Sequence, residues 1–502
     1  MLLVERKTLS LTVDEPARLE LLDALRAAQF APLIRTARRR SFELSLAAAG
    51  GLPPAPELID DFERQALSSR LRERAGPYTP GDLFCSEDAI FYLAFGDDAA
   101  RGHEAVVAGV VYDRESVDPL RRFELFCQRV RESMRLAGEG EAEAEAGELV
   151  APPWESHDVR RFPRGLTRYV ARQDEEAARA MMFREGSRER LRAAELLADE
   201  RVRAFLRREQ EARVEGYAPR LLSGESPSPE GLVPVEELVE AGLMRREVRV
   251  TCRKTRHPLF DLPTPDALAL VTLSRARCSL CATEVADEVV EEVYNPTRLA
   301  AALLADGSWL RNRVYQIVRD LGVPESEIAA GPPAEGGESH LVANVCGDAF
   351  LFALRDGELS PSFSRRVVEA AGEIEARHVI VIVTGAAEGE GRMRLYEYAW
   401  RRAREGRDVD VAVGEGAAGA RSCIEGVFER AVGGRLARDL CALDDALGMN
   451  ASRLVLTKFK MRREQAGARR AETRRAARPA PTLPGQDGEE SDAPPARLRL
   501  SS

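Results

Sequence analysis

The sequence contains no apolar run that approaches the roughly 20 residues needed to span a bilayer. Its eight cysteines in 502 residues are too few for a disulfide scaffold. Charged residues at Glu5, Arg6 and Lys7 interrupt the apolar start, which argues against a secretory signal. These absences exclude a membrane-spanning or disulfide-rich protein. We therefore expect a cytoplasmic protein in a reducing compartment, with no membrane partner.

Signatures of common catalytic sites are also missing. The chain has no P-loop, no Gly-x-Ser-x-Gly and no His-Glu-x-x-His motif. Four histidines are isolated in sequence: His103, His157, His340 and His378. A glycine-rich stretch at residues 414–419 lies between a predicted strand and a predicted helix, but Glu415 adds negative charge where a pyrophosphate would bind. We interpret this stretch as a tight strand-to-helix turn and predict no cofactor there.

The remaining composition is that of an ordinary globular protein, with 44% hydrophobic and 31% charged residues. The length predicts two to four domains, of mixed α+β and α/β class. We expect an N-terminal α+β domain at 1–136, an acidic linker with prolines at 137–156, a helical connector at 157–223, a short helix with a zinc-ribbon-like module at 224–295, a C-terminal α/β sheet domain covered by helices at 296–459, and a disordered tail, basic and then acidic, at 460–502.

Apolar patterns predict the elements of the first half of the chain. The runs at 88–96 and 103–113 are separated by glycine and aspartate and predict a β-hairpin. Residues 121–136 have helical spacing, so we interpret Cys127 as a packing residue. Alternating charges among apolar residues at 187–217 predict one long amphipathic helix that connects domains.

Three cysteines and a histidine in the middle of the chain have the spacing of a metal site. Cys252 and His257 are followed after about twenty residues by Cys278-x-x-Cys281. We predict that a strand at 244–252 and a return strand ending at Cys278 bring these residues together around Zn²⁺. Because four protein ligands leave no open position, the predicted zinc is structural. The alternative is that Cys252 and Cys278 are buried neighbours and that His257 lies in an exposed loop.

Basic residues near the first cysteine and in the tail suggest a partner. Arg253, Lys254 and Arg256 could meet phosphates of a nucleic acid. Between Lys458 and Arg478 nine basic and two acidic residues give a local excess of about +7. The alternative for this tail is a solvated segment without a partner.

Helical and strand patterns alternate in the C-terminal part, which predicts a sheet covered on both faces. The expected elements are helices at 296–322 with a break at Gly307, two strands joined at Cys346-Gly347-Asp348, a helix at 364–376, a strand at 378–385, a helix at 392–405, a strand at 408–413, a helix at about 420–447 and a strand at 453–459.

The segment FALRDGELS, its following helix and the strand HVIVIVTG resemble the core of the restriction-endonuclease-like PD-(D/E)xK superfamily, over about residues 296–400. In active members an acid on the first strand and a (D/E)-x-K triplet on the second hold a metal and activate water. The resemblance aligns this triplet with Ala353-Leu354-Arg355, in which alanine cannot bind a cation and arginine stays protonated. Asp348 could stand for the first acid, with Asp356 and Glu358 as nearby carboxylates.

Together these patterns predict a multidomain protein of bacterial type without catalytic activity. Its zinc module and degenerate nuclease-like domain would act in interaction, with nucleic acid or within a larger assembly. One alternative is a metal-dependent nuclease that uses Asp348, Asp356 or Glu358. Another is a protein–protein scaffold with no role at nucleic acid.

Overall fold

The computed structural model describes residues 1–11, 13–50, 55–72, 78–98, 103–138, 155–156, 187–214, 235–263, 265–273, 276–284, 289–331, 337–448 and 450–476. The chain divides into two units, Met1–Ala451 and Ser452–Ser502. Helices and three sheets alternate along the first unit, so the mixed α+β and α/β class is confirmed. No helix of the described residues is long and apolar enough to cross a membrane.

The N-terminal part is an antiparallel sheet with the strand order β2-β3-β4-β1-β5. Its strands are β1 (Leu2–Leu9), β2 (Gly81–Cys85), β3 (Ala89–Asp98), β4 (His103–Asp113) and β5 (Glu155–Ser156). Its helices are α1 (Glu15–Ala27), α2 (Leu33–Gly50), α3 (Pro56–Arg72) and α4 (Pro119–Gly138). Helices α1 and α4 bury their apolar residues against the sheet, and Cys127 belongs to this core. The predicted hairpin, the predicted helix and the packing role of Cys127 are confirmed.

The predicted connector helix at 187–217 is wrong, because the structure has two helices there. They are α7 (Ser187–Leu196) and α8 (Glu200–Val214). Asp199 accepts a hydrogen bond from the backbone N–H of Arg201 and so caps the second helix. Residues 157–186 and 215–223 of the predicted connector lie outside the described residues, as do residues 139–154 of the predicted linker.

The middle of the chain forms a three-stranded antiparallel sheet with the order β7-β6-β8. Its elements are the helix α9 (Val235–Glu240), the strands β6 (Met244–Thr251), β7 (Pro258–Leu262) and β8 (Val289–Pro296), and the helix α10 (Pro265–Leu273). The predicted return strand before Cys278 is wrong, since its apolar run is α10. Pro265 and Asp266 favour a helix start, and a short apolar run has no period that separates a strand from a helix.

The C-terminal sheet has the order β13-β12-β11-β10-β9. Its strands are β9 (Ile328–Ala330), β10 (Glu338–Val345), β11 (Asp348–Arg355), β12 (His378–Val383) and β13 (Asp410–Glu415), preceded by a 3₁₀ turn at Glu325–Glu327. Strands β11, β12 and β13 are parallel, whereas β10 is antiparallel to both of its neighbours. Positive φ angles of 54° at Cys346 and 81° at Gly347 make the two-residue turn between β10 and β11 and fix their register.

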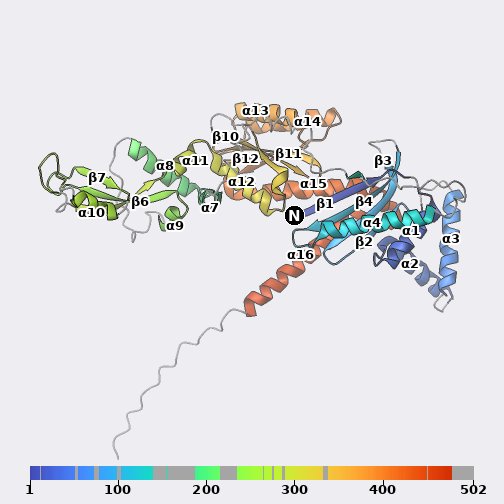
Figure 1. The fold of residues 1–502 in the computed structure, drawn as a ribbon. Coiled ribbons are helices and arrows are strands. Elements are labelled where there is room, and N and C mark those ends of the chain that lie inside the picture. The colour runs from blue at the N-terminus through green and yellow to red at the C-terminus, as the bar shows by residue number, and fades with distance from the viewer. Residues whose placement is uncertain are drawn as a thin grey trace, which may run out of the picture. The chain divides into compact units, whose positions relative to one another are not determined.

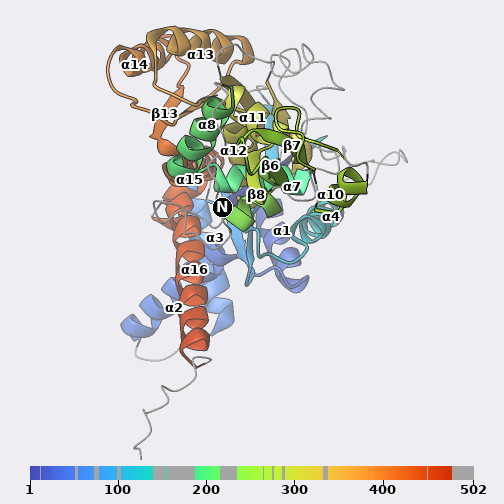
Figure 2. The ribbon, with the colours of Figure 1, turned by 90° about the vertical axis from the view of Figure 1, so that its left-hand side faces the viewer.

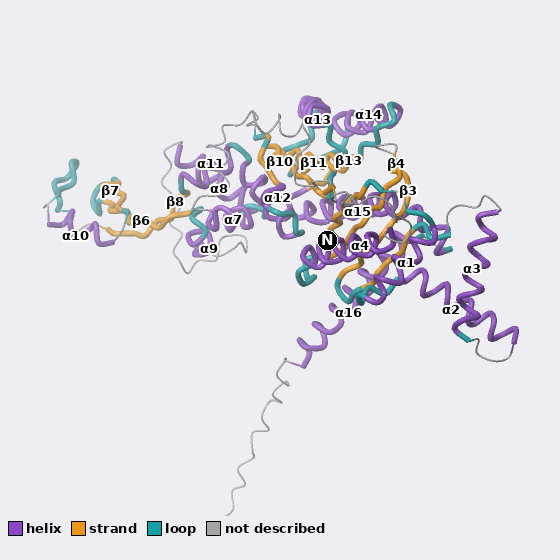
Figure 3. The backbone as a smooth tube through the Cα atoms, turned by 45° about the vertical axis from the view of Figure 1, so that its right-hand side comes forward, coloured by secondary structure: helices purple, strands orange, loops and turns teal. Residues whose placement is uncertain are grey.

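Helices cover both faces of this sheet, as the sequence predicts. They are α11 (Arg298–Ala305), α12 (Ser308–Asp320), α13 (Pro361–Ile374), α14 (Glu390–Arg404) and α15 (Gly416–Leu447). Helices α13 and α14 lie side by side over one face (Figures 1 and 2). Helices α12 and α15 contact the strands from the other face (Figure 3). The Phe428 ring of α15 meets the rings of Phe350 and Phe352 edge-on.

Helix α15 packs against two of the three sheets of the first unit. Its first half packs on β12 and β13, and its second half packs on β1, β2 and β3 of the N-terminal sheet. The buried Asp439 carboxylate accepts hydrogen bonds from Arg6 at 3.2 Å and from the Tyr92 hydroxyl at 2.9 Å. These contacts make α15 a shared layer between the two sheets.

The long helix α16 (Ala451–Ala476) belongs to the second unit except for its first residue. The predicted strand at 453–459 is therefore wrong. Its apolar residues Val455 and Phe459 are one helical turn apart, and the charged residues that follow favour a helix. The predicted disordered tail is helical up to residue 476, and residues 477–502 lie outside the described residues.

Candidate functional site

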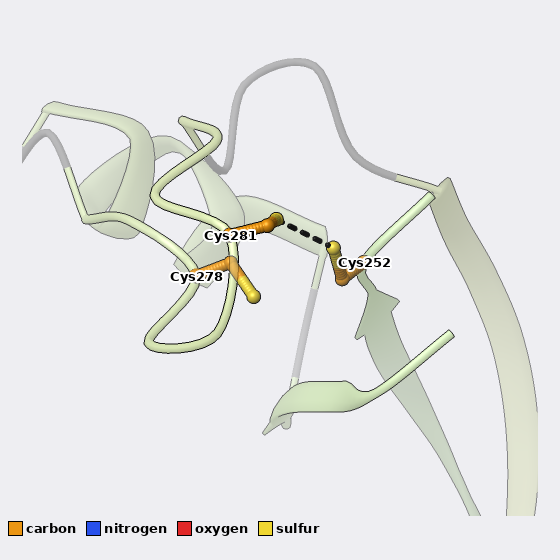
Figure 4. Close-up of side chains that lie close together, drawn as sticks. All are labelled: Cys252, Cys278 and Cys281. Carbon is orange, nitrogen blue, oxygen red and sulfur yellow. Dashed lines mark hydrogen bonds between the residues drawn. The ribbon is translucent and has the colours of Figure 1, made fainter. Parts of the chain in front are cut away.

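Three cysteines in two loops beside the middle sheet come together in space (Figure 4). Cys252 follows the last residue of β6, and Cys278 and Cys281 lie in the loop after α10. The sulfurs of Cys252 and Cys281 are 3.3 Å apart, and all three sulfurs lie within 4.8 Å of one another. Sulfurs around a tetrahedral zinc ion stand about 3.8 Å apart, because each Zn–S bond is about 2.3 Å long. The three cysteines could therefore hold a metal ion.

Two backbone turns of the same shape present these cysteines. In the first turn, the Cys252 N–H donates to the His257 carbonyl at 2.9 Å, and the Arg256 N–H donates to the Cys252 carbonyl at 2.7 Å. The second turn repeats both bonds: the Cys278 N–H donates to the Thr283 carbonyl, and the Ala282 N–H donates to the Cys278 carbonyl, each at 2.9 Å.

The fifth residue of each turn has a positive φ, 53° at Arg256 and 56° at Ala282. Residues other than glycine adopt this conformation uncommonly. Its occurrence at the same position in both turns shows that Cys252–His257 and Cys278–Thr283 are two copies of one turn.

The structure does not bring the His257 ring into the cysteine cluster. The His257 side chain is exposed, and the residue contributes its backbone carbonyl to the first turn. Among the described residues, the group of candidate metal ligands here contains the three cysteines alone. Cys252 and Cys278 are buried, and Cys281 is half-buried. A hydrogen bond with the Thr283 hydroxyl lowers the pKa of the Cys281 thiol to about 7, which favours the thiolate form that metals bind.

The cationic residues beside the cluster lie on the first turn. Arg253, Lys254 and Arg256 are all exposed. Arg277, just before the second turn, instead pairs with Glu284 at 2.9 Å. Positive charge is therefore concentrated on one of the two turns.

The three carboxylates considered for a nuclease site do not form one cluster. Asp348 begins β11 and Asp356 follows its end, so about 25 Å of extended chain separates them. Asp356 accepts hydrogen bonds from the Trp309 indole at 3.0 Å and from the Thr384 hydroxyl at 2.7 Å. Glu358 is exposed.

The acid that stands beside the Ala353-Leu354-Arg355 triplet is Glu338, which sequence reasoning missed. The hairpin register pairs Glu338 with Arg355 and His340 with Ala353. The buried Glu338 carboxylate accepts hydrogen bonds from Arg355 Nη1 and from Arg366 Nε, each at 2.8 Å. The two-residue turn at Cys346 and Gly347 was the signal that could have given this register, because it fixes which residues of the strands face each other.

A second polar cluster lies at the opposite end of the same strands. His378 begins β12, and its ring nitrogens lie 3.8 Å from Asp348 and 3.6 Å from Asp410. The ring also stacks on Phe350, with centroids 4.3 Å apart. Burial lowers the pKa of His378, but the two carboxylates outweigh burial and the pKa is raised. Arg377 and Arg430 pair with the outer sides of the same carboxylates.

Comparison with protein-family models, with curated proteins and with solved structures finds no match for this chain.

Proposed function

We propose that this protein is a non-catalytic interaction protein that binds nucleic acid through a zinc-stabilised module and carries a nuclease-like domain without a working nuclease site. The observation that carries the proposal is the pairing of Glu338 with Arg355 and Arg366 where β10 begins and β11 ends. At this end of the two strands the resemblance to the PD-(D/E)xK superfamily would require carboxylates that are open to a metal ion and a lysine.

The arginine pairing disfavours nuclease chemistry for two reasons. Two guanidinium groups already satisfy the Glu338 carboxylate, and arginine does not lose its proton to act as a base. Ala353 offers no oxygen at the position of the triplet's acid. The order of elements from α12 to β12 supports the nuclease-like fold, while these side chains support a role in binding.

Zinc is the metal that the cysteine cluster favours. Thiolates select zinc over magnesium or calcium, which bind oxygen ligands. The compartment that we propose is the reducing cytoplasm, where cysteine thiols stay available to bind zinc. A structural ion would hold the two turns together and so fix the position of the cationic first turn.

Two exposed surfaces of the first unit support nucleic acid as the partner. The first turn presents Arg253, Lys254 and Arg256. Helix α14 exposes Tyr396 and Trp400, which are 42% and 62% accessible, with the Arg392 and Arg404 guanidinium groups over their rings. Aromatic rings and arginine together are the groups on which unpaired bases stack. In the second unit, α16 carries most of the basic residues between Lys458 and Arg478.

The test is fluorescence anisotropy of the full chain with single-stranded and double-stranded DNA and RNA at low and moderate salt. We expect binding that weakens as salt rises, because phosphate contacts release counterions. A triple variant, R253A/K254A/R256A, should bind at least about tenfold more weakly and show a smaller salt dependence.

The matched control removes the same charge elsewhere, with the exposed residues Arg26, Arg40 and Arg64 replaced by alanine. It should bind like the unaltered chain. If both variants lose the same affinity, binding depends on net charge alone and not on the first turn. If the chain binds no nucleic acid at all, the result favours a protein–protein scaffold.

Catalysis is tested separately, with Mg²⁺ or Mn²⁺ and the same nucleic acids. We expect no cleavage. Metal-dependent turnover that disappears in E338Q, or in D348A at the other end of β11, would replace our proposal with a nuclease.

A further inference from the structure

The repeated turn shows where a fourth metal ligand would stand. In the second turn, Cys281 is the fourth residue and carries a ligand sulfur. The fourth residue of the first turn is Thr255. Because the backbone bonds and the positive φ recur in both turns, Thr255 occupies the place that a fourth cysteine would take.

The contacts of Thr255 agree with the position of a fourth metal ligand. Its backbone N–H donates to the Cys252 sulfur at 3.5 Å, and its hydroxyl oxygen lies 3.9 Å from the Cys278 sulfur. Thr255 thus touches two of the three candidate ligand atoms. A neutral threonine hydroxyl is a much poorer zinc ligand than a thiolate or an imidazole, so it does not close the site as cysteine would.

The same corner faces solvent. Thr255 is exposed, whereas Cys252 and Cys278 are buried. The exposed cationic side chains of Arg253, Lys254 and Arg256 surround Thr255 in sequence on the same turn. A donor that approaches this corner therefore meets positive charge, which favours an anion.

We propose that the metal ion held by Cys252, Cys278 and Cys281 has its fourth coordination position beside Thr255, and that this position accepts an anionic donor from outside the chain, a thiolate above all. This inference rests on the metal site of the proposed function and adds that its fourth coordination position is open to a ligand from outside the chain. His257 takes no part in coordination.

Cobalt(II) replaces zinc in thiolate sites and reports the number of sulfur ligands through its charge-transfer absorption. We expect the full chain to bind one Co²⁺ with three thiolates. The T255C variant should raise the charge-transfer absorption by about one third, from three thiolates to four, and bind zinc more tightly. T255V, which removes only the hydroxyl, and H257A should keep the absorption of the unaltered chain.

The open position is tested by adding 2-mercaptoethanol to each cobalt-loaded protein at a pH where part of the thiol is ionised. The unaltered chain, T255V and H257A should gain absorption towards that of T255C, and T255C itself should not respond. Imidazole at the same concentration is the neutral comparison. A larger response to imidazole than to the thiol would overturn the anionic preference.

Other outcomes overturn the inference in distinguishable ways. A changed spectrum in H257A, with cobalt still bound, would assign the fourth position to His257 and leave the metal site of the proposed function intact. A T255C spectrum identical to that of the unaltered chain would remove Thr255 from the site. Failure of the unaltered chain to bind cobalt or zinc would overturn both the inference and the zinc module.

Discussion

In the C-terminal sheet, every residue of β12 is buried, and rings from β11 and α15 pack between the layers. In the proposed metal module, which we define as residues 244–296, the core cluster found among the described residues has the buried members Val248, Val250 and Leu262, and Met244, Val293 and Tyr294 are buried outside this cluster. Large apolar side chains of this module are instead exposed, with Leu270 at 71%, Leu273 at 80% and Leu280 at 66%.

The comparison shows that the two regions bury apolar side chains to different extents. Burial of apolar surface stabilises the C-terminal sheet, at about 25 cal/mol for each Å² removed from water. The core cluster of the proposed metal module is small, so we expect cross-linking by a metal ion to add to its stability. The predictions below separate the two sources.

The largest effect should come from removing the metal ligands. A C278S/C281S variant is expected to lose about one zinc per chain, and with it a metal-binding free energy on the order of 10 kcal/mol that is coupled to folding of the module. Hydrogen exchange should show that residues 244–262 lose protection while β11 and β12 keep theirs. C85S/C441S, which changes two exposed cysteines, is the control and should keep its zinc. If the module keeps its protection from exchange without metal, a metal ion does not stabilise it.

A cavity in the C-terminal core should have the next largest effect. Phe352 is fully buried against Phe428, so F352A should lower the free energy of unfolding by about 3–5 kcal/mol in urea denaturation. L273A in the exposed part of the module should change it by less than about 0.5 kcal/mol. Zinc content should stay the same in both variants. Loss of zinc in F352A would show that the two regions are not independent.

Ion pairs should also contribute more to stability in the C-terminal sheet than in the metal module. E338Q removes a buried charge that two arginines contact and should cost about 2 kcal/mol. E292Q removes the exposed partner of Arg246 in the metal module and should cost at most about 0.5 kcal/mol. Urea midpoints of both variants at one salt concentration measure the difference. Equal costs would contradict the burial that we assign to Glu338.

The smallest effects should be the pH dependences of two buried histidines in the C-terminal sheet. The raised pKa of His378 means that its stabilising contribution is full below about pH 6.5 and is lost as pH rises through the folded-state pKa. H378Q should therefore cost more stability near pH 5.5 than near pH 8, by about 1 kcal/mol.

His340 should behave oppositely. Burial lowers its pKa to about 4, so the unfolded chain binds a proton that the folded chain does not as pH falls from about 6.5 towards 4. Stability due to His340 is lost on acidification, and H340Q should remove that loss. Urea midpoints across this pH range measure both variants, and parallel curves for the two would refute the assignment.

Much of the fold could be predicted because its elements have long, regular apolar patterns. The hairpin of β3 and β4, the helix α4 and the alternation from α11 to α15 follow such patterns. The wrong strand predictions fall on short apolar runs, whereas the predicted connector helix at 187–217 is interrupted at Asp199 and the tail is helical up to residue 476. Residues 267–273 and 453–459 are apolar enough for strands, but the context after Pro265 and the charges after Phe459 made both helical.

The candidate site could be predicted only in part. The spacing of Cys252, Cys278 and Cys281 is local information, and the structure brings these residues together. The fourth ligand position that we propose depends on the shape of a turn, which spacing does not reveal. His257 has the better ligand chemistry, but its carbonyl, not its ring, takes part in the turn, and Thr255 lies beside the sulfurs of Cys252 and Cys278.

The sequence by itself determined the class of the fold and the three thiols, because periodicity and ligand type are properties of neighbouring residues. Only the tertiary structure decided that Glu338 faces Arg355, that His378 lies between Asp348 and Asp410, and that α15 serves two sheets. Each of these depends on strand register or on packing between distant segments. One residue of register moves a side chain to the opposite face of a sheet, so such neighbours are fixed only when the whole sheet has formed.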